Sequence, residues 1–287
     1  MHTPSSQKIT PIVQASQLFE LYKNEDLVII DAGNGKSAKD NYAKKHLDKA
    51  LFVDLNAELS YVKEDAADGG RHPLPSIDDF VTTLKKLGIN KESHVVVYDD
   101  KNGANSAARF WWMLRAVGHL KVQVLNGGIQ QAEKVGLPTN NTFVQPKKVE
   151  DYVATHWMLP IAEMAEVEKH SEDKDYLVID VREQKRYRGD FEPIDLIAGH
   201  IPGAMNIPFS TNLTQEGMFL SQNQLREKYQ KHFEQTKPEN IIVHCGSGVT
   251  ACHTLLAIDY AGLEIPKLYV GSWSEWSRNN KKIVQEV

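Results

Sequence analysis

The residue of this chain best suited to covalent chemistry is Cys245, one of only two cysteines. It follows the apolar run "NIIVH" (240–244) and precedes the small residues "GSGVT" (246–250), after which "ACHTLLAI" (251–258) predicts a helix. A thiolate is a strong nucleophile, and a thiol ionises more readily beside a helix N-terminus. This position therefore predicts a nucleophilic role for Cys245.

The small residues after Cys245 could wrap backbone N–H groups around its sulfur. Glycine allows close approach and backbone conformations that a Cβ would obstruct, and N–H groups that converge at a helix start bind an anion. The alternative is a buried strand-end cysteine that acts only as a small apolar residue, but the Gly-Ser-Gly sequence favours the functional interpretation. The residues predicted to form this anion-binding loop are Gly246, Ser247, Gly248, Val249 and Thr250.

Two other cysteine chemistries are disfavoured. A Cys-x5-Arg phosphatase loop uses its arginine to hold the phosphoryl group, but Ala251 stands six residues after Cys245 and the loop contains no arginine. The local signatures of papain-like proteases are also missing. The second cysteine, Cys252, is expected to pack inside, and a disulfide with Cys245 exceeds the usual reach.

The elements around Cys245 predict an α/β fold. Val- and Ile-rich runs such as "LVII", "VVVY", "VQVL", "YLVID" and "IIVHC" indicate buried strands. Between them, "SIDDFVTTLKKLG" (76–88) has the Ser start, early acidic residues and Gly stop of a helix. Alternating strands and helices predict parallel sheets with helices on both faces. Such sheets bind ligands at the carboxyl ends of their strands, where Cys245 lies.

The same plan occurs twice in the chain. Three landmarks recur in the same order, at offsets of 149, 146 and 144 residues: Asp31 with Asp180, Asp99 with Cys245, and Gly127 with Gly271. We therefore expect a first domain over residues 8–137, a linker over 138–155 and a second domain over 156–287. The chemistry is expected in the second.

Composition and sequence patterns argue against several other classes of protein. The 287 residues are 41% hydrophobic and 25% charged, and the net charge of −5 gives no sign of nucleic-acid binding. No apolar run approaches the ~20 residues of a membrane helix, and "MHTPSSQKITP" lacks the pattern of a signal peptide. We expect a cytoplasmic protein that binds no membrane. No His, Cys or Asp spacing fits a metal site, so we expect neither a metal nor a cofactor.

Several stretches together resemble the tandem-domain sulfurtransferases of the rhodanese superfamily. They are "CGSGVTAC" (245–252), "DVREQKRYRGD" (180–190), "AGHIPGAMNIP" (198–208), "YVGSWSEW" (269–276), "RHPLP" (71–75), "RFWWMLRAVGH" (109–119) and "VLNGG" (124–128). The resemblance covers nearly the whole chain and implies two rhodanese-like domains. It also implies that the first is catalytically inactive, with Asp99 at the position of Cys245.

Within that superfamily, the loop is most similar to that of the mercaptopyruvate sulfurtransferases. The resemblance implies that Cys245 takes sulfur from 3-mercaptopyruvate as a persulfide and passes it to cyanide, a small thiol or a thioredoxin-like protein. Thiosulfate as the donor is one alternative. A persulfide carrier or binding module for a partner protein is another.

The resemblance also assigns roles to individual residues. Ser247 is implied to be catalytic with Cys245, and Arg186 to bind the anionic end of the donor. His72 resembles a histidine that relays protons with this serine, although an interdomain structural role is equally open. Two positions depart from the pattern: Ile194 stands where a second donor-binding arginine is expected, and Asn56 where an acidic partner of His72 is expected.

Other residues of these stretches are expected to be structural. Arg188 is the local alternative to Arg186, and His200 is expected to stabilise a turn. Trp273 and Trp276 are expected in the core first and at a pocket wall second.

Overall fold

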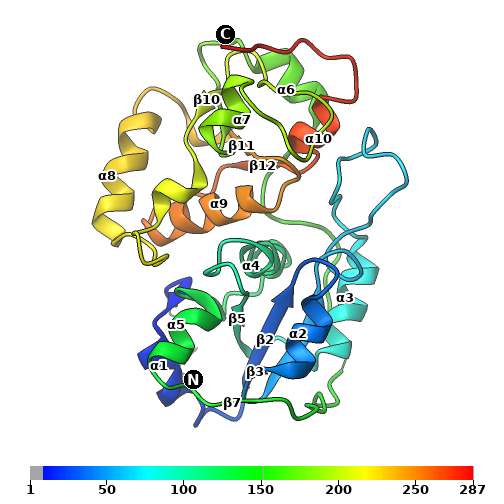
Figure 1. The fold of residues 1–287 in the computed structure, drawn as a ribbon, viewed down its shortest axis with the longest axis vertical. Coiled ribbons are helices and arrows are strands. Elements are labelled where there is room, and N and C mark those ends of the chain that lie inside the picture. Colours follow the sequence, from blue (N-terminus) through cyan, green and yellow to red (C-terminus); the bar gives the residue numbers. More distant parts are fainter. Residues whose placement is uncertain (1–8, 151, 287) are drawn as a thin grey trace, which may run out of the picture.

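The chain forms two α/β domains stacked along its long axis (Figure 1). The structure is a computed structural model that describes residues 9–150 and 152–286. Residues 1–8, 151 and 287 lie outside the described part, including the two outer ends of the expected domains and one position of the expected linker.

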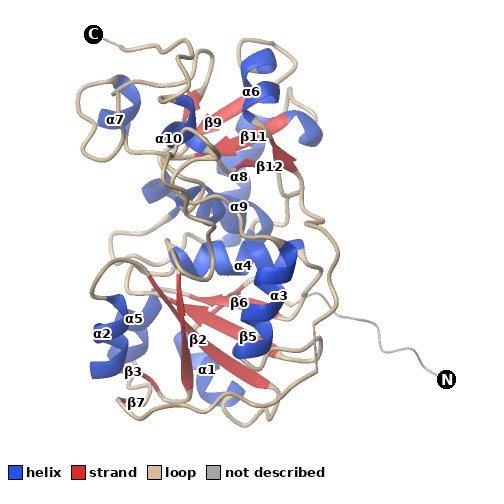
Figure 2. Ribbon diagram, turned by 90° about the vertical axis from the view of Figure 1, so that its right-hand side faces the viewer, coloured by secondary structure: helices blue, strands red, loops and turns tan. Residues whose placement is uncertain are grey.

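The first domain contains a parallel sheet in the order β1-β6-β5-β2-β4. Its strands are β1 Ile12–Val13, β2 Leu27–Gly33, β4 Ala50–Asp54, β5 His94–Tyr98 and β6 Val122–Leu125. Its helices, which cover both faces in Figure 2, are α1 Ala15–Leu21, α2 Ala38–Lys44, α3 Ile77–Lys86, α4 Ser106–Ala116 and α5 Gly128–Lys134. A short antiparallel pair joins β3 His46–Leu47 to β7 Thr139–Asn140, within the segment expected as a linker.

The second domain repeats this topology, with the order β10-β9-β11-β12-β8 and parallel pairing throughout. Its strands are β8 Ile161–Ala162, β9 Leu177–Asp180, β10 Met205–Asn206, β11 Ile241–His244 and β12 Lys267–Tyr269. Its helices are α6 Met164–His170, α7 Gln184–Arg188, α8 Gln222–Phe233, α9 Thr250–Tyr260 and α10 Ser272–Trp276, with 3₁₀ turns η1 Phe209–Asn212 and η2 Pro238–Asn240. The predicted α/β fold class is confirmed, because each domain contains a parallel sheet with helices around it. The strands β5 and β11 occupy the same central position in the two sheets.

The predicted helix over 76–88 shows how local sequence sets these elements. Ser76 caps α3 by accepting the N–H of Asp79 at 3.1 Å, as N-cap residues do. At the other end Gly88 takes φ +66°, a left-handed conformation that favours glycine and ends the helix.

Helices α4 and α9 form the centre of the domain interface, where they face each other in Figure 1. Every residue of α4 except Arg115 is buried, so the stretch "RFWWML" (109–114) builds core and interdomain surface. Arg115 forms an ion pair across the interface with Asp259 of α9, at 3.1 Å. The core thus continues from one domain into the other.

The segment between β4 and α3 also crosses to the second domain; it is the cyan loop that rises beside α10 in Figure 1. The N–H of Gly69 donates to Glu275 Oε1 at 3.0 Å, and the N–H of Arg71 donates to Ser274 Oγ at 3.0 Å. Asn279 reaches back to the carbonyl of Ala67 at 2.8 Å. This segment therefore brings residues of the first domain to the carboxyl end of the second sheet.

None of the helices in the described part of the chain is both long and apolar enough to span a bilayer.

Candidate active site

Cys245 is the first residue after β11, at the carboxyl end of the central strand of the second sheet. Its side chain is almost fully buried, with 2% of the residue exposed. Its N–H donates to Ser272 Oγ at 3.1 Å, and its carbonyl accepts the N–H of Trp273 at 3.0 Å. The strand end and the start of α10 thus fix the backbone on both sides of the thiol.

The loop after Cys245 turns sharply into α9. Gly248 has φ +74°, and a Cβ there would lie 2.6 Å from the carbonyl oxygen of Val270, so only glycine fits. Val249 precedes the helix and Thr250 is its first residue. The first N–H groups of a helix have no partner within it, so this loop ends in donors available to an anion.

Ser247 and His72 meet across the domain interface, as Ser247 Oγ and His72 Nδ1 lie 2.8 Å apart. The other ring nitrogen, Nε2, lies 3.0 Å from Asn56 Oδ1. An amide oxygen only accepts hydrogen bonds, so Nε2 carries the ring proton and Nδ1 accepts from the serine hydroxyl. Asn56 therefore contacts His72 but contributes no negative charge.

The surroundings of His72 favour its neutral form. Burial, together with the charges of Arg71 and Arg109, lowers the pKa of His72 to about 3. Because Asn56 is uncharged, nothing in the hydrogen-bonded series Ser247, His72 and Asn56 offsets this effect. A neutral imidazole thus holds the Ser247 hydroxyl near neutral pH.

Arg186, from α7, lies beside the loop but is held by two carboxylates. Its Nη2 atom lies 2.7 Å from Glu192 Oε1 and 3.1 Å from Asp195 Oδ2. A Cβ built on Gly246 would lie 3.4 Å from the same Nη2, so the guanidinium borders the residue next to Cys245. Ile194 is exposed and offers only its backbone N–H, which donates to Glu192 Oε1 at 3.0 Å.

Arg71 is a second guanidinium at this place, and the sequence did not predict it. A Cβ on Gly246 would lie 3.0 Å from Arg71 Nη2, and Arg71 Nε donates to Asp195 Oδ1 at 2.9 Å. Arg278 joins the same carboxylate at 3.4 Å. Among the described residues, Nη1 of Arg71 and Nη1 of Arg186 have no hydrogen-bond partner, so both remain available to a ligand. The only sequence signal was the position of Arg71 beside His72 in "RHPLP".

The corresponding loop of the first domain contains an anion of its own. Asp99 follows β5 as Cys245 follows β11, and it is 1% exposed. Its Oδ1 atom accepts the N–H groups of Lys101 and Gly103 at 2.9 and 2.8 Å. Its Oδ2 atom accepts those of Asn105 and Ala107 at 3.0 and 3.1 Å. This fold therefore gathers N–H groups around the side chain that follows its central strand.

The residues expected to be structural pair with surface charges, stack on a neighbouring ring or lie in the core. Arg188 is half-exposed beside Asp190 and Glu286. His200 stacks on Tyr187, whose carbonyl lies 2.9 Å from His200 Nδ1. Cys252, Trp273 and Trp276 are buried in the core, and burial raises the pKa of Cys252 to about 12.

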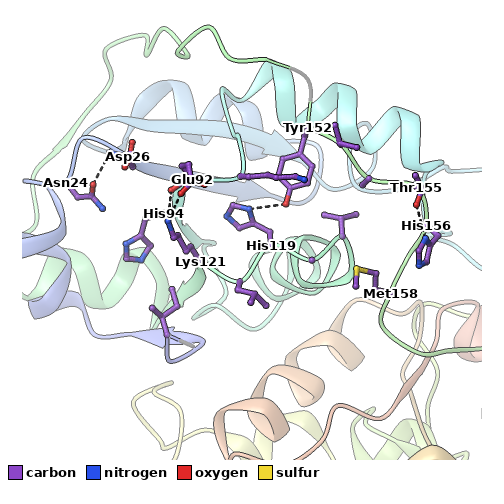
Figure 3. Close-up of a pocket in the computed structure, with 17 residues that line it drawn as sticks. Asn24, Asp26, Glu92, His94, His119, Lys121, Tyr152, Thr155, His156 and Met158 are labelled. Atoms are coloured by element: carbon purple, nitrogen blue, oxygen red, sulfur yellow. Dashed lines mark hydrogen bonds and ion pairs between the residues drawn. The ribbon is translucent and has the colours of Figure 1, made fainter. Parts of the chain in front are cut away.

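A large cavity elsewhere in the molecule lacks the features of the Cys245 site. About 990 Å³ in volume, it borders the amino ends of β5 and β6, the opposite end of the sheet from Asp99 (Figure 3). Some of its polar groups pair with one another: His119 with Tyr152 at 3.2 Å, and Lys121 with Glu92 at 3.0 Å. Among residues 9–150 and 152–286, no set of three or more His, Cys, Asp or Glu side chains is arranged to hold a metal ion.

Comparison with known families matches both domains. The model of the rhodanese-like domain fits residues 14–134 and again residues 163–279. The chain therefore belongs to the rhodanese family, as a tandem of two such domains, and the resemblance seen in the sequence is confirmed.

Individual relatives indicate the class of activity of this family member. The probable 3-mercaptopyruvate sulfurtransferase of Pseudomonas aeruginosa is 34% identical over 280 residues, which cover 95% of this chain and 97% of that protein. The thiosulfate sulfurtransferase of Bos taurus is 36% identical over 246 residues, covering 84% and 80%. The solved structure of SseA from Escherichia coli, described as a 3-mercaptopyruvate sulfotransferase, has a TM-score of 0.77 and 31% identity, covering 93% of this chain and 100% of that one. The protein is an enzyme of the sulfurtransferase class.

Proposed function

We propose that this protein transfers sulfur from 3-mercaptopyruvate to a thiol through a persulfide on Cys245. The observation that carries the proposal is the pairing of Ser247, two residues after Cys245, with His72 from the other domain at 2.8 Å. This pairing supports the proposal because it joins a hydroxyl to a proton acceptor two residues from the nucleophile, and cleavage of a carbon–sulfur bond with an enolate leaving group needs such a proton relay.

The first half-reaction forms the persulfide. The Cys245 thiolate attacks the donor sulfur, so that an S–S bond forms while the bond from that sulfur to carbon breaks. The electron pair of the broken bond leaves on carbon, as the enolate of pyruvate. The proton of the donor thiol balances the enolate, and the products are pyruvate and an anionic persulfide. N–H groups of the 246–250 loop stabilise that anion, as an oxyanion hole does.

Ser247 and His72 move this proton. As Ser247 Oγ takes the proton of the donor thiol, its own proton passes to His72 Nδ1, and the return along the same path protonates the enolate. Because burial lowers the pKa of His72 to about 3, the imidazole is neutral beforehand and releases the proton readily.

The second half-reaction returns the enzyme to its thiolate form. An acceptor thiolate attacks the outer sulfur, a new S–S bond forms, and the electron pair of the old one returns to Cys245. The acceptor is a small thiol or a thioredoxin-like protein, with cyanide as an artificial substitute. Two covalent half-reactions predict ping-pong kinetics.

The donor carboxylate lies between Arg186 and Arg71. Both guanidinium groups border Gly246 and retain an unpaired Nη1, and a carboxylate suits such planar donors. In this proposal Arg71 contributes what the exposed Ile194 does not. Thiosulfate is the second candidate donor, because the same pair of cations would also attract its sulfonate end.

A donor comparison tests the proposal. We expect kcat/KM to be larger for 3-mercaptopyruvate than for thiosulfate, and mass spectrometry to find one added sulfur atom on Cys245 after incubation with the donor. Cys245→Ser should lose both the activity and the mass increase, whereas Cys252→Ser should keep them. Preference for thiosulfate would reassign the donor. A persulfide formed only with a sulfur-donating partner protein would favour a carrier, and full activity of Cys245→Ser would refute the mechanism.

A further inference from the structure

Arg109 is a buried arginine of the first domain that contacts the site in the second. It lies in the first turn of α4 and is 0% exposed. Its Nη1 donates to the carbonyl of Gly248 at 3.2 Å, and its Nη2 donates to the carbonyl of His72 at 3.0 Å. One side chain therefore fixes the backbone of both the sulfur loop and the histidine that faces it.

The charge of Arg109 has no carboxylate partner among the described residues. Its Nε atom also lacks a hydrogen-bond partner there. A guanidinium is costly to bury without a counter-ion, so stability alone does not account for this residue. Burial lowers the pKa of Arg109, and the groups that oppose this shift are the thiols of Cys252 and Cys245. Of these two thiols, Cys245 is the one that the proposed mechanism ionises, since burial raises the pKa of Cys252 to about 12.

The contact with Gly248 sets the direction of the next N–H. The Gly248 carbonyl accepts from Arg109 and also from Cys252 Sγ, at 3.2 Å in both cases. In a planar trans peptide the carbonyl and the following N–H point in opposite directions. The N–H of Val249 therefore points away from Arg109 and Cys252.

The first domain shows where such an N–H points. Asn105 immediately precedes α4, as Val249 precedes α9, and its N–H donates to Asp99 Oδ2 at 3.0 Å. Asp99 occupies the position of Cys245. The loop after Cys245 is two residues shorter than that after Asp99, but both lead directly into the helix, and the matching positions at the two helix starts indicate that the N–H of Val249 faces the sulfur of Cys245.

The counterpart of Arg109 is neutral. Arg109 is the fourth residue of α4, and His253 is the fourth residue of α9. His253 is completely buried, near the backbone of Gly103 in the Asp99 loop, and burial lowers its pKa to about 3. The loop with a built-in carboxylate thus faces a neutral ring, whereas the loop with a thiol faces a cation.

We propose that Arg109 is a positioning residue: through the carbonyls of Gly248 and His72 it directs the Val249 N–H at the Cys245 sulfur and holds a positive charge beneath it. The inference rests on the proposed persulfide mechanism. It makes the first domain, which has no nucleophile at Asp99, a necessary part of the active site.

The test compares Arg109→Met and Arg109→Lys with Arg115→Met. Methionine keeps the apolar volume of the stem, and lysine also keeps the charge. Arg115 is the matched control, because it lies on the same helix and also contacts α9, through Asp259, but does not touch the loop. For each variant, thermal unfolding would establish that the protein is folded. Steady-state kinetics with 3-mercaptopyruvate and single-turnover transfer from the persulfide to cyanide would follow.

For Arg109→Met we expect kcat to fall about 10- to 100-fold, less than the roughly 100- to 1,000-fold cost of removing an oxyanion-hole donor, because the Val249 N–H is misdirected and not removed. The KM for the donor should stay within about twofold, because Arg71 and Arg186 hold it. Arg109→Lys should recover part of kcat, and Arg115→Met should lower the unfolding temperature while leaving kcat unchanged. If Arg109→Met does not fold, Arg109→Lys against Arg115→Met remains the comparison, with an intermediate loss of kcat expected only for the former.

Three results would overturn the inference: native kcat in folded Arg109 variants, equal losses in Arg109→Met and Arg109→Lys, or an equal loss in Arg115→Met. Mass spectrometry of the native protein separates these three results from failure of the proposed function, because it shows whether the persulfide on Cys245 forms at all. If the native protein forms no persulfide, the mechanism itself is wrong, and the role of Arg109 falls with it.

Discussion

Arg71 and Arg186 approach the same glycine from different domains. Each binds Asp195, and that carboxylate is completely buried. Asp195 therefore keeps two like charges close together, which would otherwise repel each other. Both guanidinium groups border Gly246 through Nη2, and the Nη1 atom of each has no hydrogen-bond partner among the described residues.

Replacing Arg71 tests this arrangement at the level of one residue. For Arg71→Met we expect the KM for 3-mercaptopyruvate to rise at least about 10-fold, because hydrogen bonds to a charged group contribute about 1.5–3 kcal/mol. The value of kcat should change much less, since Arg71 is not assigned to the reacting sulfur. Steady-state kinetics provide the measurement.

Arg188→Met is the control for Arg71→Met, because Arg188 is half-exposed at the end of α7 and pairs with Asp190 and Glu286 instead. It should behave as the native enzyme. A KM for Arg71→Met equal to the native value would exclude Arg71 from the donor site.

The two loops that follow the central strands differ in what occupies them. In one, four N–H groups converge on the carboxylate of Asp99; in the other, the corresponding position holds the sulfur of Cys245. Burial raises the pKa of Asp99, while these four donors lower it. The loop after β5 therefore binds a carboxylate of the chain itself, whereas the equivalent loop after β11 has no such carboxylate.

Asp99→Ala tests whether the loop itself requires an anion. Removal of the carboxylate leaves four buried N–H groups without their acceptor, and one such group costs about 1–3 kcal/mol. We expect the first domain to lose at least about 2 kcal/mol of stability. Urea unfolding followed by tryptophan fluorescence measures this. Asp99→Asn, which keeps one acceptor oxygen, should lose less, and native stability of Asp99→Ala would show that the N–H groups need no acceptor.

The sequence predicted those elements whose signals are local. Alternating apolar runs gave the strands, Ser76 and Gly88 gave the ends of a helix, and Cys245 with its glycines gave the nucleophile loop. Arg71 and Arg109 were missed as site residues, because each contacts a residue of the other domain more than a hundred positions away, Asp195 and Gly248 respectively, and only the packed interface brings them together. One signal was available for Arg109: a charged residue at the start of the otherwise apolar "RFWWML".

At the scale of the whole molecule, folding buries histidines that cannot easily accept a proton. Burial lowers the pKa of His119 to about 4 and that of His253 to about 3. In an unfolded chain they would titrate near 6.5. Between these values the unfolded chain binds more protons than the folded protein, so these residues make stability fall as the pH falls below about 6.5. Asp31 acts in the opposite direction, because burial raises its pKa to about 7 and the folded state holds that proton.

His253 allows this pH dependence to be measured for one group. Its ring lies 4.6 Å from that of Phe219, and neither ring nitrogen forms a hydrogen bond of normal geometry within the described part of the chain. For His253→Phe we expect the free energy of unfolding to fall less steeply between pH 6 and pH 4.5, by about 1.4 kcal/mol per pH unit, the value for one proton. Urea unfolding at a series of pH values would measure this slope. His253→Leu should show the same change in slope, although its stability at pH 8 will differ because its shape does. If either variant keeps the native slope, His253 takes up a proton in the folded protein and the interface is more accessible to water than its burial indicates.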